Sequence, residues 1–180
     1  MRRDLTLVIL SMIVWGIGEG MFFFFQPLYL QELGANPITI GVILGSVGVV
    51  MALVHIPAGY LADRFGRRQL LWSAWILGTL ATLIMAFAPS LQFFVAGMVI
   101  YGITIFVAVP LNSYVTAARG SLTIGRVLTF SSAAFNLGAI IGPIIGGLIG
   151  QVAGLQTTFK IAALFFVIST GLILFIRKQQ

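Results

Sequence analysis

The sequence predicts an all-α membrane protein whose six transmembrane helices form two inverted three-helix repeats. Three observations lead to this prediction. The 180 residues are 59% hydrophobic and 8% charged, with a mean hydropathy of +1.10, and a soluble domain of this length cannot bury so much apolar surface. The apolar stretches allow about six crossings of about 20 residues each. The basic residues gather in alternate connecting segments, as they do between membrane helices.

Each predicted helix is an apolar stretch that ends at charged residues, at a proline or at a glycine-rich turn. Together they form one bundle over residues 1–180, with helices at about 5–30, 38–62, 70–88, 91–114, 125–149 and 158–176. The first stretch is too long for a signal peptide and lacks a small-residue cleavage site, so we interpret it as a membrane helix. Pro27 and Pro110 are expected to kink the first and fourth helices.

The Lys and Arg residues predict the orientation of the chain. Of the 10 such residues, all but Lys160 lie in segments that share a side with the two termini. The positive-inside rule then places both termini in the cytoplasm. We expect the membrane to be the plasma (inner) membrane. The same distribution explains the net charge of +6 without nucleic-acid binding, because no basic patch with interleaved aromatics is present. The sequence has no cysteine, which excludes disulfides and thiol chemistry.

The two halves of the sequence resemble each other. Residues 38–44 (ITIGVIL) resemble residues 122–128 (LTIGRVL). A pair of glycines seven positions apart also recurs, as Gly59 and Gly66 and again as Gly147 and Gly154. Because each unit has three helices, the second unit is inverted in the membrane. Its copy of the arginine-rich turn then lies outside, where arginine is disfavoured, and the arginines are absent there.

The densest cluster of charge is the turn between the second and third helices, residues 59–68 (GYLADRFGRR). A generic positive-inside loop explains its three arginines but not its carboxylate or its two glycines. Asp63 and Arg67 are four residues apart and can pair where the helix end continues into the loop. Gly59 permits the close approach of another backbone, and Gly66 permits a tight turn.

These residues resemble the signature loop between helices 2 and 3 of the major facilitator superfamily, roughly G-x-L-a-D-r-x-G-r-r. The resemblance covers residues 5–178 and implies half of a twelve-helix fold whose two parallel halves enclose the transport site. It implies a secondary active transporter that moves a small solute by alternating access, by efflux or coupled to protons, without a cofactor and without enzyme activity. In the family this loop is a conformational gate, here formed by Gly59, Asp63, Arg64, Gly66, Arg67 and Arg68.

Glycines at intervals of four mark the fifth helix. Residues 142–147 (GPIIGG) resemble the fifth-helix motif of drug–proton antiporters in the same superfamily. A ridge that lets another helix pack closely explains these glycines equally well. Met98 departs from the exporter pattern, because many proton-coupled members carry an arginine at that position. The residues of this helix-packing motif are Gly138, Gly142, Pro143, Gly146 and Gly147.

Glu19 is the only acidic residue well inside a predicted span. A charged side chain there costs about 2.5–3.5 kcal/mol, so we expect it to face a cavity or to be protonated. We interpret Glu19 as a group that couples transport to a proton or binds a cation. A structural carboxyl that bonds to another helix is the alternative. Three polar residues near prolines or in mid-helix are further candidates for the same cavity: Gln26, Asn112 and Asn136.

The resemblance to half a transporter leaves the partner of the chain open. Two alternatives are open. The chain is an N-terminal half, that is, a fragment that needs a second six-helix half, or it is one copy of a homodimer about an axis normal to the membrane. A membrane protein that transports nothing and acts only as an assembly partner is the alternative function. The expected partners are membrane lipid, a small-molecule solute and a proton, with no nucleic acid and no metal.

Overall fold

The computed structural model describes residues 3–178, with only the backbone described at residues 58, 59, 62 and 63. The described residues form helices joined by short connections and contain no strand. The elements are α1 (Arg3–Phe23), α2 (Gln26–Glu32), α3 (Pro37–Phe65), α4 (Arg67–Ala86), α5 (Leu91–Ile103), the 3₁₀ helix η1 (Thr104–Val107), α6 (Ala108–Ala117), α7 (Ile124–Ala153) and α8 (Leu155–Leu174). By length and composition, 6 stretches of the described chain can cross a membrane, with α5, η1 and α6 forming one of them. This confirms the predicted fold class.

Two of the spans are broken about one turn before a proline. Proline lacks an N–H, and its ring clashes with the carbonyl of the residue four positions earlier. For Pro27 that residue is Phe23, where α1 ends before α2 begins. For Pro110 it is Phe106, which lies in the 3₁₀ segment η1. The first helix of each three-helix unit is therefore interrupted in the same way, although each had been predicted as one continuous helix.

The tight joints after the second helix of each unit are also equivalent. Gly66 alone connects α3 to α4, and Gly154 alone connects α7 to α8. Both have φ of +82°, a value that glycine adopts far more readily than other residues. As a result, α3 continues to Phe65 and α7 to Ala153, beyond the predicted ends at 62 and 149. At the end of α3, charged residues limit the stretch that can lie in lipid, but they do not end the helix; at the end of α7, the glycine and glutamine that suggested a loop are helical.

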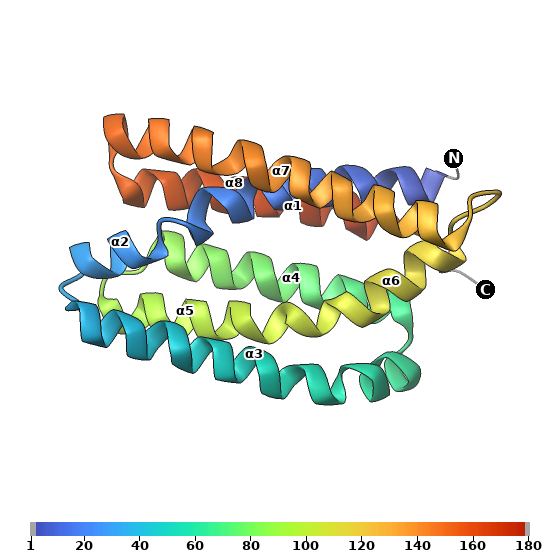
Figure 1. The fold of residues 1–180 in the computed structure, drawn as a ribbon, viewed down its shortest axis with the longest axis horizontal. Helices are drawn as coiled ribbons and strands as arrows, with labels where there is room; N and C mark the ends of the chain where they lie inside the picture. The colour runs from blue at the N-terminus through green and yellow to red at the C-terminus, as the bar shows by residue number, and fades with distance from the viewer. Residues whose placement is uncertain (1–2, 179–180) are drawn as a thin grey trace.

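The helices form two layers (Figure 1). One layer contains α1, α7 and α8, and the other contains α3, α4, α5 and α6. The layers are joined mainly where α4 packs against α8. Both termini, the α3–α4 joint and the α6–α7 loop lie at the same end of the bundle. We call it the basic end, because it carries Arg64, Arg67, Arg68, Arg119, Arg126 and Arg177.

Glycines bring the backbones of α1 and α7 into direct contact. A Cβ atom added at Gly138 would collide with the Ile13 carbonyl oxygen, and one added at Gly142 would lie 2.8 Å from the Cα atom of Gly20. On α1, an added Cβ at Gly20 would lie 2.8 Å from the Ala139 carbonyl oxygen. Small residues on both helices allow this approach, which supplies the dispersion contacts that hold helices together in lipid. The glycine ridge of α7 therefore packs against α1.

Buried hydroxyl groups fasten α1 to α4 and α8. The Ser169 hydroxyl donates to the Ser11 carbonyl oxygen at 2.8 Å, and the two hydroxyl oxygens are 2.8 Å apart. The Trp75 indole N–H lies 2.9 Å from both hydroxyl oxygens. One turn further along, the Thr79 and Thr170 hydroxyls are 2.7 Å apart. Interhelical hydrogen bonds of this kind contribute on average about 0.6 kcal/mol each in a membrane. They fix the inner face of α1.

Candidate functional site

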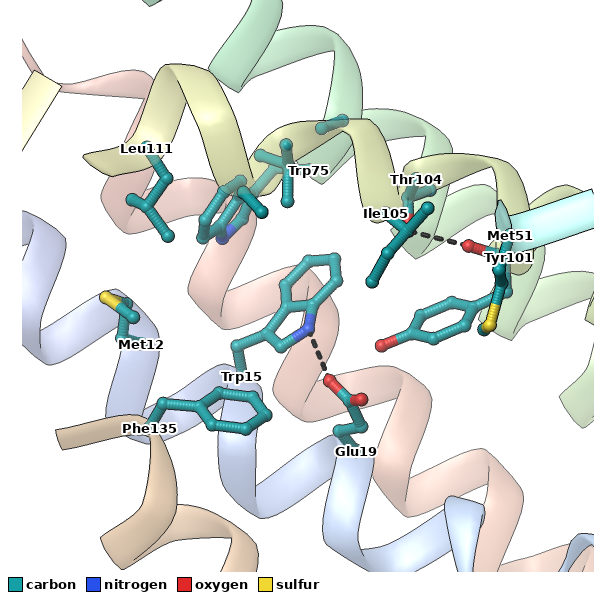
Figure 2. Close-up of a pocket in the computed structure, with 13 residues that line it drawn as sticks. Met12, Trp15, Glu19, Met51, Trp75, Tyr101, Thr104, Ile105, Leu111 and Phe135 are labelled. Atoms are coloured by element: carbon teal, nitrogen blue, oxygen red, sulfur yellow. Dashed lines mark hydrogen bonds between the residues drawn. The ribbon is translucent and has the colours of Figure 1, made fainter. Parts of the chain in front are cut away.

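A cavity of about 240 Å³ lies between the two layers, and Glu19 lines it (Figure 2). Glu19 lies near the middle of the α1–α2 span, one turn before the break at the end of α1. The Trp15 indole N–H donates to the Glu19 carboxylate at 3.0 Å. The Tyr101 side chain points toward the same carboxylate. None of the residues that line this cavity is basic, so no lining side chain neutralises a charge on Glu19.

Trp15 is held in place by rings from three other helices. Its ring centroid lies 5.0 Å from that of Trp75 on α4 and 4.4 Å from that of Phe166 on α8. Tyr101 on α5 stacks on it at 6.3 Å with an interplanar angle of 19°. Gly78 leaves room for the ring edge, because a Cβ there would lie 2.5 Å from Trp15 Cη2. Packing of this kind locks the rotamer of the donor and therefore the orientation of the Glu19 carboxylate.

Most of the remaining wall of the cavity is apolar, and helices of both layers contribute to it. Met12 on α1, Met51 on α3, Leu111 on α6 and Phe135 on α7 all line it. A cavity with apolar and aromatic walls and one acidic group is the usual form of a binding site for a small amphiphilic molecule. A solute with an apolar body and a cationic or hydrogen-bonding group fits this chemistry.

The structure brings only part of the predicted polar set to this region. Gln26 is buried and lines a second cavity, which adjoins the first. Asn112 on α6 is exposed, and Asn136 on α7 is exposed with its amide bonded to the Ser132 carbonyl oxygen at 2.8 Å. Neither asparagine lines either of these two cavities.

The helix-packing residues of α7 lie on different sides of that helix. Gly138, Gly142 and Gly146 are buried against α1. Pro143 also reaches α1, since its Cδ would lie 2.8 Å from a Cβ added at Gly20. Gly147 makes no such approach, because an added Cβ there would meet only the Phe25 ring at 3.6 Å.

The expected gate residues surround the α3–α4 joint at the basic end. Only the backbone is described at Gly59 and Asp63, so the expected pairing of the Asp63 side chain with Arg67 lies outside the described residues. The Arg64 guanidinium donates to the Tyr60 hydroxyl at 3.3 Å. The guanidinium of Arg68 lies 4.2 Å from the centroid of the Trp72 ring.

Trp15, Trp75 and Tyr101 were not identified as site residues from the sequence. Trp15 had a usable signal, because it precedes Glu19 by four residues and therefore lies on the same helix face. Trp75 and Tyr101 come from α4 and α5 and are more than 50 residues away along the chain, so no local pattern connects them to Glu19.

Comparison with known proteins identifies the family. The sequence profile of the Major Facilitator Superfamily matches residues 8–180. Tetracycline resistance protein, class H, of Pasteurella multocida is 28% identical over 184 aligned residues, which cover 100% of this chain and 46% of that protein. An uncharacterized MFS-type transporter of Methanocaldococcus jannaschii is 28% identical over 144 residues, covering 79% of this chain and 37% of that protein.

A putative multidrug resistance protein of Yersinia enterocolitica is 30% identical over 144 residues, covering 75% of this chain and 29% of that protein. The chain spans less than half the length of each of these three relatives. The family match extends over nearly all of the six spans described above. The chain is therefore an integral membrane protein that belongs to the Major Facilitator Superfamily.

Proposed function

We propose that this chain supplies half of the passage through which a secondary active transporter exports a small amphiphilic solute by alternating access. The observation that carries the proposal is the carboxyl group of Glu19, which lines an apolar cavity without a basic side chain in its wall. Relatives named for resistance to tetracycline and to multiple drugs support export of such a solute.

Glu19 is proposed to couple transport to a proton or a cation. A carboxylate near the centre of a membrane costs about 2.5–3.5 kcal/mol. One hydrogen bond from Trp15 offsets part of that cost, since a bond to a charged group contributes about 1.5–3 kcal/mol. Uptake of a proton, or binding of a cation from the cavity, removes the charge and the remaining cost. Solute and proton can therefore compete for the same carboxylate.

The α3–α4 joint is proposed as the conformational gate, with Gly59, Asp63, Arg64, Gly66, Arg67 and Arg68 as its residues. Gly66 is a single-residue hinge between two long helices, which supports this role. The positive-inside rule supports a cytoplasmic location for the basic end, and hence for both termini. The membrane is proposed to be the plasma membrane. The partner across the passage is proposed to be a second six-helix unit, either a second half or a second copy of this chain.

Glu19→Gln is the variant that tests the coupling role. A pH gradient would be established across inverted membrane vesicles that contain the protein. The vesicles would be prepared with and without a co-produced second six-helix half. Uptake of tetracycline and of ethidium would then be followed. Glu19→Gln should abolish the dependence of uptake on the gradient, because glutamine cannot exchange a proton in this range. Glu32→Gln is the matched control, because Glu32 is an exposed carboxyl at the end of α2. Equal gradient dependence in Glu19→Gln and the control would refute the coupling role.

A further inference from the structure

Gln26 is a buried amide without a hydrogen-bond partner among the described residues. It is the first residue of α2, immediately after the break that Pro27 imposes, and it is 6% exposed. No described side chain or backbone group bonds to its amide. Buried polar groups in proteins are nearly always paired, with protein, water or a ligand. The Gln26 amide is not fully enclosed by protein, because it opens onto a cavity, and water or a ligand in that cavity can bond to it.

The amide lines a cavity of about 320 Å³, which we call the Gln26 cavity. Its wall is otherwise apolar, with Phe23, Leu44, Val47 and Met98 among the lining side chains. Neither a carboxylate nor a basic side chain lines it, so it does not favour a charged group. A glutamine amide both donates and accepts a hydrogen bond. Its best partner is a neutral group that does the same, such as an amide or a hydroxyl next to an apolar body.

The Gln26 cavity adjoins the Glu19 cavity, and Met51 and Tyr101 line both. Tyr101 is fixed by edge-to-face contacts with Phe22 at 5.0 Å and with Phe166 at 5.8 Å. Met51 on α3 is partly buried, and methionine is flexible enough to change rotamer at low cost. The wall between the two cavities therefore has one rigid member and one adaptable member.

We propose that the Gln26 cavity is a second binding subsite, which takes the neutral hydrogen-bonding end of an amphiphilic solute whose other end lies beside Glu19. The position of the other end beside Glu19 rests on the proposed function, whereas binding of the neutral end rests on the Gln26 cavity alone. The two subsites differ in chemistry: one offers an acidic group, and the other offers a neutral donor and acceptor. Solutes that carry one complementary group at each end are favoured over simple lipophilic cations.

The sequence has no cysteine, so a single introduced cysteine can report on this cavity. Gly48 lines the Gln26 cavity, and a Cβ there would meet no atom within 4 Å, so Gly48→Cys fits without strain. The rate of alkylation of Gly48→Cys by N-ethylmaleimide would be measured in membrane vesicles. Protection would be titrated with benzanilide, a neutral aromatic amide, and with trans-stilbene, which has the same shape but no amide.

Benzanilide should slow alkylation, and Gln26→Met should raise the half-protecting concentration about five- to tenfold, because one hydrogen bond is lost. Protection by trans-stilbene should not depend on residue 26. Gln31→Met is the matched control, because Gln31 is an exposed glutamine on the same helix, and it should change neither titration. Methionine is unbranched and similar in length to glutamine, and an unchanged alkylation rate without ligand would verify that the variant is folded.

Two results would overturn the subsite. One is the absence of protection by benzanilide up to its solubility limit, which would mean that the cavity holds only water. The other is equal protection by benzanilide in the parent and in Gln26→Met. The alkylation assay requires no flux, so its failure is distinct from a failure of the Glu19→Gln transport test.

Discussion

Replacing Gly142 by alanine should separate α1 from α7. The added Cβ would meet the Ile17 carbonyl oxygen and would lie 2.8 Å from Gly20 Cα and 2.9 Å from Gly20 C, all of which are backbone atoms. Backbone cannot rotate away as a side chain can, so the two helices must move apart. Overpacking of this kind costs about 1–3 kcal/mol. Removing a glycine from a helix interior offsets part of this cost, by up to about 1 kcal/mol.

Gly147→Ala provides the matched control on the same helix. Its added Cβ would lie 3.6 Å from the Phe25 ring, which is ordinary van der Waals contact. Both variants gain the same helix propensity, so the difference between them isolates the overpacking cost of about 1–3 kcal/mol. Unfolding in mixed micelles, with an increasing fraction of sodium dodecyl sulfate, measures this difference through the tryptophan fluorescence. Equal unfolding free energies for Gly142→Ala and Gly147→Ala would refute the backbone contact between α1 and α7.

Two further predictions concern the frame around the site. A double-mutant cycle of Ser11→Ala and Ser169→Ala should give a coupling energy of about 0.6–1.7 kcal/mol in the same unfolding assay, because the two hydroxyls bond between α1 and α8. In the control cycle, Ser11→Ala and Ser132→Ala should be additive, because Ser132 is exposed on α7. Additivity in both cycles would disprove the buried hydrogen bond. Gly66→Ala should destabilise the protein by about 1–3 kcal/mol, because φ at Gly66 is +82°. Gly125→Ala should not destabilise it, because the added Cβ would meet no atom within 4 Å. An unchanged unfolding free energy for Gly66→Ala would show that the joint does not require glycine.

The six spans could be predicted from the sequence because the bilayer imposes their length and composition on the chain. The position of Glu19 beside a cavity followed from the cost of a charge in lipid, which leaves few other places for an acid. The breaks before Pro27 and Pro110 could be placed only as kinks. The sequence does not say whether a proline bends a helix or divides it, because the surrounding contacts decide.

The packing and hydrogen-bond partners of these residues could not be predicted, because they depend on contacts between segments that are distant in the sequence. The spacing of Gly138, Gly142 and Gly146 predicts a face for close packing, but not that α1 packs there. Ser11 and Ser169 are separated by 158 positions and carry no local signal of their bond. Asn136 was predicted as a cavity residue from its polarity in mid-helix, whereas its amide NH₂ donates locally to the Ser132 carbonyl oxygen and it lines neither cavity described above.

We propose a six-span bundle whose basic end faces one side of the membrane, so that a passage beside Glu19 can open to either side. Accessibility of single cysteines to a membrane-impermeant maleimide tests it most directly, at exposed positions in a chain that has no other cysteine. Arg67→Cys and Arg177→Cys should react only in inverted vesicles, and Gln156→Cys, near the start of α8, only in right-side-out vesicles. Labelling of Arg67→Cys and Arg177→Cys from opposite sides would contradict the six-span arrangement.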